Sequence, residues 1–175
     1  MSTTLKLSTD ASGKSVDQTL YQRMIGSLLY LTVGRTDISF SVGVCARYQA
    51  DPKESHLSSV KRIIHFLNGT SNYGIWHSFD INTSLVGFSD TDWAGHCDDR
   101  KSTSGGCFFL GNNLVSWFCK KKNWISLSTA EVEYIATGSG CTQLLWMKQM
   151  LVDYEFNQGL SILTSIITSL ECLNM

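Results

Sequence analysis

Apolar residues recur at helical spacing in the first third of the chain. Between residues 17 and 32, they fall every three or four positions. The residues on this stripe are Leu20, Met24, Leu28 and Leu31. Since residues at this spacing share one face of a helix, the pattern predicts an amphipathic helix.

Two further helices are expected before residue 70. The first starts after Thr36 and ends before Pro52, and the second has Ser55 as its N-cap and stops at Gly69. The residues expected to face inward are Ile38, Val42 and Cys45 in the first helix, and Leu57, Val60, Ile64 and Leu67 in the second. The three helices predict a small helical unit.

The pattern then changes to that of strands. Segments with strand character are residues 73–77, 84–89, 106–110 and 113–118. Gly111-Asn112 joins the last two as a hairpin turn. A long helix is expected from Thr129 to about Asp153. This order, helices, then an antiparallel sheet, then a helix packed on it, indicates an α+β fold.

The expected organisation has four parts. Residues 1–16 are polar and form a flexible lead-in, and residues 17–77 form the helical unit. Residues 78–156 form the sheet with its helix. Residues 157–175 are a tail without clear periodicity.

Composition excludes several classes of protein. The 175 residues carry a net charge of −1, so a nucleic-acid surface must be local. The three consecutive lysines Lys120, Lys121 and Lys122 fit either a nucleic-acid backbone contact or a solvated turn. The six cysteines lack C-x-x-C spacing, which favours free thiols, no disulfides and an intracellular location, without distinguishing cytoplasm from nucleus. No apolar run is long enough to predict a membrane span.

Two acids compete at the end of the strand 84–89. Because side chains alternate along a strand, Asp90 continues the face that carries Val86 and Phe88. Asp92 lies where the chain is expected to turn. Asp90 is therefore the preferred functional acid, although both could be solvated turn acids.

Two acids also compete at the start of the long helix. Ser128 and Glu131 fit a capping box, in which Glu131 accepts from the Ser128 amide. Glu133 instead heads an apolar stripe through Gly140 and Leu144. A carboxylate in that place needs a partner or a metal, unless it merely reaches solvent at the helix edge.

A metal ion would reconcile Asp90 with Glu133 if the two converge. Their repulsion at about 4 Å is of order 1–4 kcal/mol, so either a proton or a cation must lie between them. Mg²⁺ suits hard oxygen ligands and keeps positions for water and phosphate. A two-ion phosphodiesterase site normally takes three or four carboxylates.

Several motifs resemble the Ty1/copia-type retrotransposon Pol polyprotein. Those similar to its ribonuclease H domain are Phe88-Ser-Asp-Thr-Asp-Trp-Ala-Gly95, Asp98-Asp-Arg-Lys-Ser-Thr-Ser-Gly105, Ser116-Trp117 with Lys120-Lys121, and Leu127-Ser-Thr-Ala-Glu-Val-Glu-Tyr-Ile-Ala136. Those similar to the end of its reverse transcriptase are Tyr21-Gln-Arg-Met-Ile-Gly-Ser-Leu-Leu-Tyr-Leu31, Arg35-Thr-Asp-Ile38 and Leu67-Asn-Gly-Thr70. The resemblance covers roughly residues 17–156.

The resemblance implies a thumb- or connection-like helical unit followed by a ribonuclease H-like mixed sheet with a packed helix. It also implies hydrolysis of the RNA strand of RNA–DNA hybrids with Mg²⁺. Asp90 matches the first catalytic acid and metal ligand, and Glu133 the second. The other implied partner is the rest of the Pol polyprotein.

The chain departs from the family after the long helix. The family has a strand that ends in Cys-Asp-Asn and supplies a third acid, followed by a fourth ligand. Here residues 161–167 take the place of that strand, and no aspartate follows Glu155. The ribonuclease H domain is thus expected to be truncated, with one sheet edge open and catalysis impaired. The alternative is a non-catalytic remnant or a weak hybrid-binding module.

Overall fold

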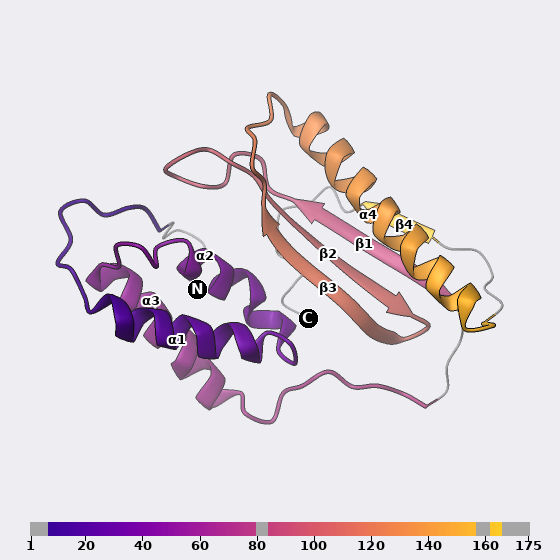
Figure 1. Cartoon of the computed structure of the whole chain (residues 1–175), viewed down its shortest axis with the longest axis horizontal. Helices are drawn as coiled ribbons and strands as arrows, with labels where there is room; N and C mark the ends of the chain where they lie inside the picture. Colours follow the sequence, from indigo (N-terminus) through magenta and orange to yellow (C-terminus); the bar gives the residue numbers. More distant parts are fainter. Residues whose placement is uncertain (1–6, 80–83, 157–161, 166–175) are drawn as a thin grey trace. The chain divides into compact units, whose positions relative to one another are not determined.

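The described structure consists of two units, each with its own core. The computed structural model describes residues 7–79, 84–156 and 162–165 (Figure 1). The helical unit runs to Ile75 and includes the loop residues His96–Asp98, and the sheet unit contains Trp76–Gly95 and the chain from Asp99 onward. The division after Ile75 lies close to the expected boundary between residues 77 and 78.

Helix α1 spans Gln18–Leu31 and begins with a side-chain cap. The Asp17 carboxylate accepts hydrogen bonds from the backbone N–H groups of Thr19 and Leu20, at 2.8 and 3.2 Å. These bonds satisfy two of the donors that the first turn of a helix leaves unpaired. The predicted helix is confirmed.

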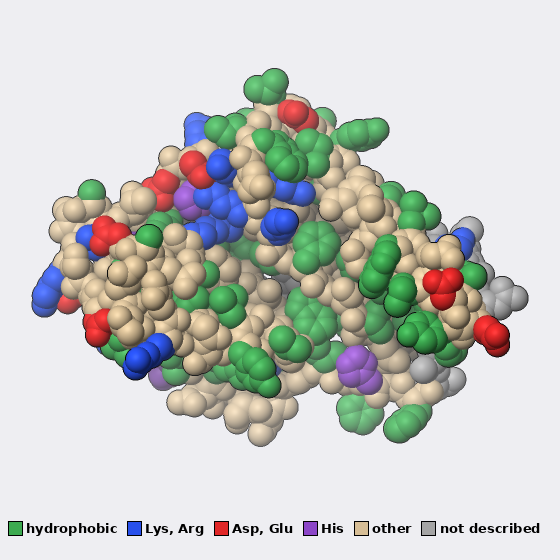
Figure 2. Space-filling view, viewed as in Figure 1, with side chains coloured by type: hydrophobic (Ala, Val, Ile, Leu, Met, Phe, Trp, Pro, Cys, Tyr) green, Lys and Arg blue, Asp and Glu red, His purple; other side chains and the backbone are tan. Residues whose placement is uncertain are grey.

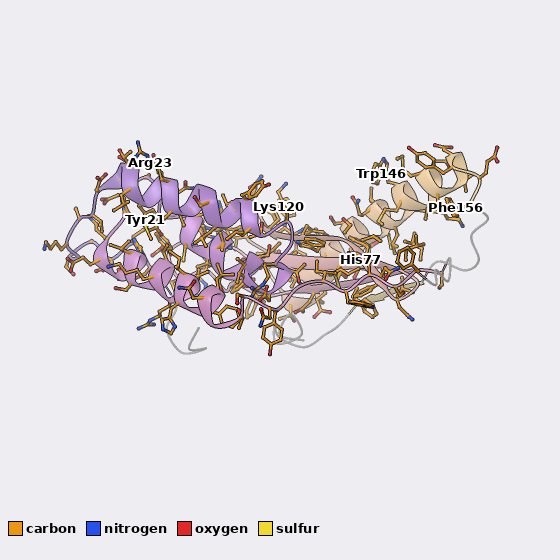
Figure 3. All side chains as sticks on the ribbon, turned by 90° about the horizontal axis from the view of Figure 1, so that it is seen from below. Tyr21, Arg23, His77, Lys120, Trp146 and Phe156 are labelled. Atoms are coloured by element: carbon orange, nitrogen blue, oxygen red, sulfur yellow. The ribbon has the colours of Figure 1, made fainter. Side chains whose placement is uncertain are left out.

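The buried face of α1 differs from the predicted one. Tyr21 and Ile25 are fully buried, whereas Leu20 is 49% and Leu31 43% exposed (Figure 3). The prediction was right for Leu28, which is buried, and for Met24, which is partly buried against the core. It was wrong for Leu20 and Leu31, because α1 carries apolar residues on two adjacent stripes. The Tyr21 hydroxyl helps to select the observed stripe, because it donates to the buried Cys45 carbonyl at 2.9 Å.

The next helical segment confirms the predicted inward residues. A 3₁₀ turn, Thr36–Ile38, leads into α2 at Ser39–Ala46. Ile38, Val42 and Cys45 are at most 3% exposed. They pack with the buried face of α1 in the core of the helical unit.

Helix α3 spans Glu54–Gly69, and its N-cap is Lys53 rather than the predicted Ser55. The Lys53 backbone N–H donates to Nδ1 of the buried His56 at 3.0 Å, and the other ring nitrogen of His56 lies 2.8 Å from the Ser8 carbonyl. The predicted end at Gly69 is confirmed.

The inner face of α3 is also shifted from the prediction. Val60 is fully buried as predicted, but Ile63 takes the inner position expected of Ile64, which is 37% exposed. Leu57 and Leu67 are partly buried against the same core.

Residues 7–16 of the expected flexible lead-in make specific contacts with the start of α3. The Val16 N–H donates to the Pro52 carbonyl at 3.1 Å, and the Glu54 N–H donates to the Lys14 carbonyl at 3.0 Å. The prediction of flexibility missed these long-range backbone bonds. Residues 1–6 lie outside the described part of the chain.

The described sheet has four strands in the order β3-β2-β1-β4 (Figure 1). The strands are β1 at Leu85–Thr91, β2 at Thr103–Leu110, β3 at Asn113–Lys121 and β4 at Ile162–Ser165. β2 is antiparallel to both β1 and β3, whereas β4 is parallel to β1. The sheet is therefore mixed. β4 lies within the expected tail and pairs with one edge of β1.

The predicted hairpin between β2 and β3 is confirmed. Leu110 pairs with Asn113, and Gly111 in the two-residue turn has a φ of 59°, which glycine adopts without strain. The strand expected at residues 73–77 does not form. Tyr73 and Trp76 are 72% and 85% exposed, and the segment has no partner strand within the described residues.

Helix α4 spans Thr129–Asp153 and packs across one face of the sheet. In this contact Leu144 lies in one cluster with Leu85 of β1 and Phe108 of β2. Partly buried Phe118, Met147 and Leu151 extend the cluster. The α+β architecture and the long final helix are thus confirmed.

Substitutions on α1 test its observed face. Ile25→Ala should lower the free energy of unfolding by about 2–5 kcal/mol, because it leaves a cavity in the core. Leu20→Ala should change it by about 1 kcal/mol or less, because that side chain is half exposed. Urea unfolding followed by circular dichroism measures both. Equal losses would contradict the observed face.

Candidate functional site

Asp90 lies near the end of β1, opposite Gly105 of β2. Its Oδ1 accepts from the Thr91 backbone N–H at 2.8 Å. The sequence argument placed Asp90 on the packed face of the strand. Instead, α4 covers the opposite face, which carries the fully buried Leu85, and Asp90 shares the half-buried face of Phe88.

Asp92 closes the loop between β1 and β2. Its backbone N–H donates to the Thr103 carbonyl at 3.0 Å, and its Oδ1 accepts from the Thr103 N–H. A Cβ at Gly95 would collide with the Asp92 carboxylate, so the glycine leaves room for it. Asp92 therefore has a structural role in this turn.

The acids at the start of α4 also divide into structural and available groups. Ser128 is the N-cap, as predicted, and its Oγ accepts from the Glu131 N–H at 3.2 Å. Glu131 Oε2 accepts from the Leu127 N–H at 2.7 Å, rather than from the predicted Ser128 amide. Glu131 thereby satisfies a donor at the helix entrance.

Glu133 lies at the edge of the buried stripe of α4, not at its head. The fully buried positions in this part of the helix are Val132 and Ala136, at 1% and 3% exposure. Glu133 itself is half buried. The predicted stripe agrees with the structure from Gly140 onward and is displaced by one residue before it.

The charge of Glu133 acts on the Asp90 carboxyl. Burial raises the pKa of the Asp90 carboxyl, and the negative charges of Glu133 and Asp92 raise this pKa further, while the Thr91 N–H opposes the shift. A strand and a helix more than forty positions apart thus place two carboxylates within electrostatic range. Their catalytic and metal-binding roles stay predictions.

Carboxylate oxygens such as those of Asp90 and Glu133 are the kind of ligand that a hard cation prefers. Mg²⁺ is usually held by one or two carboxylates and keeps several waters, which two half-buried carboxylates allow. Among the described residues, no group of three or more His, Cys, Asp or Glu side chains could hold a metal ion. The two acids alone do not match the ligand number of a two-ion site.

The three lysines do not behave alike. Lys121 Nζ lies 2.8 Å from Asp99 Oδ2, and Lys101 lies 3.6 Å from the same oxygen. Lys120 is exposed, whereas Lys122 Nζ lies 5.6 Å from the centre of the Trp124 ring. Sequence reasoning missed the roles of Asp99 and Trp124. The aromatic residue two positions after the last lysine was the available signal for the second.

The described residues add two observations on the chain's surroundings. Neither α4 nor any other described helix combines the length and apolar character needed to cross a membrane. The described cysteines, which exclude Cys172, form no disulfide bond.

The structure so far defines an α+β protein in which the long helix α4 packs on one face of a mixed sheet. The Pol polyprotein from transposon RE1 of Arabidopsis thaliana is 37% identical to the chain over 148 residues, which are 85% of this chain and 10% of that protein. The Pol polyprotein from transposon TNT 1-94 of Nicotiana tabacum is 34% identical over 139 residues, 79% of this chain and 10% of that protein.

The match to one shorter relative covers most of that relative's length. The secreted RxLR effector protein 161 of Plasmopara viticola is 37% identical over 128 residues, which are 73% of this chain and 90% of that protein. No family model and no solved structure matches the chain. The chain is homologous to a segment of Ty1/copia-type Pol polyproteins, and it spans about one tenth of the length of the RE1 and TNT 1-94 polyproteins.

The pH dependence of stability should separate Asp90 from Asp92. With its raised pKa, Asp90 binds a proton more tightly in the folded than in the unfolded chain. Its ionisation therefore lowers stability as pH rises, and the cost persists at neutral pH. Asp90→Asn should stabilise the fold at pH 7, and the gain should vanish below the ordinary aspartate pKa of about 3.9.

Asp92→Asn is the matched control, measured by urea unfolding between pH 3 and 8. It should destabilise the fold at neutral pH by about 1 kcal/mol, because the charged acceptor of the Thr103 N–H becomes neutral. If both substitutions or neither stabilised the fold, the distinction between Asp90, whose charge is destabilising, and Asp92, whose charge is structural, would be contradicted.

Proposed function

We propose that residues 78–156 are the ribonuclease H-like part of a copia-type Pol polyprotein, and residues 17–77 the end of its reverse transcriptase. The substrate of this activity is the RNA strand of an RNA–DNA hybrid. The observation that carries the proposal is the packing of α4, which holds Glu133, on the sheet in which β1 holds Asp90, so that the charge of Glu133 acts on Asp90. These are the two acids that the motif resemblance selects.

The sheet topology supports this assignment. The resemblance implies a mixed sheet in which the first strand carries the first acid. β1 has this place, between antiparallel β2 and parallel β4, with α4 packed over it. The competing acids have structural hydrogen bonds, which leaves Asp90 and Glu133 for the chemistry.

Asp90 and Glu133 would hold Mg²⁺ through their carboxylate oxygens. When bound, the metal would stabilise negative charge on the phosphate and lower the pKa of a water nucleophile. The protein's own contribution is to hold the two carboxylates together despite their repulsion. The proposed nucleic-acid contact includes Lys120, Lys121 and Lys122. β3 ends at these lysines, at the same end of the sheet at which β1 ends after Asp90.

Catalysis by this chain is proposed to be impaired. The family site takes four acids, and the only acids of this sequence after α4 are Glu155 and Glu171. A lost metal ligand removes transition-state stabilisation, and a loss of several kcal/mol corresponds to a rate lower by a factor of about 10³ or more. The alternative is a non-catalytic module that binds the hybrid.

A cleavage assay tests the activity. The purified chain, a hybrid with labelled RNA and Mg²⁺ should give slow cleavage, about 10³-fold or more below that of a complete ribonuclease H. Asp90→Asn and Glu133→Gln should abolish it, while Glu131→Gln should retain it. No cleavage by the parent chain would support the non-catalytic alternative. Cleavage that survives Asp90→Asn would refute the assigned site.

Metal binding can be tested without activity. Mg²⁺ should raise the melting temperature of the parent chain, because the ion relieves the repulsion between the two carboxylates in the folded state. The rise should disappear in Asp90→Asn and in Glu133→Gln, but persist in Glu131→Gln. An equal rise in all four proteins would show that the metal binds elsewhere.

A further inference from the structure

Two lysines lie near the end of β3, Lys120 within the strand and Lys122 just after it. Asp99 pairs with Lys121 and Lys101 of the neighbouring basic residues. Among the described residues, neither Lys120 nor Lys122 has a carboxylate within ion-pair distance. In Figure 2, Lys and Arg side chains gather beside exposed apolar side chains at the top of the view.

Lys122 lies in an environment in which a bound anion would stabilise its positive charge. Its backbone N–H donates to the Ser102 carbonyl at 2.8 Å, and its ammonium group lies over the Trp124 ring. Burial and then the positive charge of Lys120 lower the pKa of Lys122. A phosphate between the two ammonium groups would compensate both effects.

One indole, that of Trp124, lies beside Lys122, and a second, that of Trp93, is hydrogen-bonded to the segment that contains Trp124. The Trp93 Nε1–H donates to the Ser126 carbonyl at 3.3 Å, which ties the loop after β1 to the segment that contains Trp124. Trp93 is 48% and Trp124 45% exposed. Leu127 in the same segment is 89% exposed, so this surface is apolar as well as basic.

We propose that the surface formed by Lys120, Lys122, Trp93 and Trp124 binds single-stranded nucleic acid. The ammonium groups contact phosphates, and unpaired bases stack on the indoles. Basic side chains interleaved with exposed aromatic rings are typical of proteins that bind single strands. A blunt duplex offers its phosphates but hides the faces of its internal bases, so it leaves the indoles without partners.

This platform, the four residues just named, does not depend on the proposed hydrolysis. It requires neither Asp90 nor a metal. It would hold an unpaired extension of a nucleic acid whose paired part lies elsewhere.

Binding of labelled 12-nucleotide strands, measured by fluorescence anisotropy in EDTA, tests the platform. Trp124→Ala should weaken binding of oligo(dT) roughly five- to hundredfold, since one stacked base is lost, and Trp124→Phe should retain most of it. Lys122→Gln should weaken binding and reduce the salt-dependence slope by about 0.7. An abasic strand should bind weakly and not respond to Trp124→Ala.

Matched controls come from α4, where Trp146 is also exposed, at 58% (Figure 3). Trp146→Ala and Lys148→Gln should leave binding unchanged. Thermal melts establish that each variant is folded. If Trp124→Ala does not fold, Lys122→Gln still tests the platform independently. Binding of oligo(dT) unaffected by Trp124→Ala and Lys122→Gln in folded proteins would overturn the proposal, as would equal binding of abasic and normal strands.

The same measurements separate this proposal from the hydrolysis. Asp90→Asn should bind oligo(dT) as the parent does, even where it abolishes cleavage. A blunt hybrid should bind Trp124→Ala and the parent chain equally. Loss of single-strand binding in Asp90→Asn would contradict the independence of the platform.

Discussion

The packing of α4 across β1 and β2 is the contact on which the sheet unit depends. Leu144 meets Leu85 and Phe108 there, and Gly140 is buried one helical turn earlier. Since β1 is also paired on both edges, it is fixed by two neighbouring strands and one helix. The same contact sets where the first turns of α4 lie, and therefore brings Glu133 toward Asp90. Core packing thus creates a repulsion between the carboxylates of Asp90 and Glu133 that neither β1 nor α4 has alone.

That conflict is consistent with a binding site. The pKa of Asp90 is raised, so its ionised carboxylate destabilises the fold. A proton or a cation would compensate the negative charge. The neighbouring acids show the opposite arrangement, since Asp92 and Glu131 accept backbone hydrogen bonds that close a turn and cap a helix. Of the four acids in these two motifs, Asp92 and Glu131 therefore have structural roles. Asp90 and Glu133 have no such role and are the candidates for metal binding. The lysines around the end of β3 divide likewise, because Asp99 forms an ion pair with Lys121 but not with Lys120 or Lys122 among the described residues.

Much of the fold could be predicted because local patterns carry it. Helical spacing, the N-cap Ser128 and the glycine turn between β2 and β3 depend on residues near in sequence, and they were found. Errors arose where long-range contacts choose between similar local options. α1 buries Tyr21 rather than Leu20, because the Tyr21 hydroxyl meets Cys45. Residues 73–77 alternate like a strand but have no neighbour to pair with among the described residues.

The sequence alone determined the motifs and the order of the elements, and it led to the preference for Asp90 and Glu133 over Asp92 and Glu131, which stays a prediction. Strand alternation and helix capping are local rules, so one chain without relatives was enough to apply them. Only the tertiary structure decided that α4 covers the face of β1 opposite to Asp90, that β4 pairs with β1, and that Trp93 is tied to the segment of Trp124. These contacts join residues tens of positions apart, and their energies depend on packing and burial that no local pattern contains.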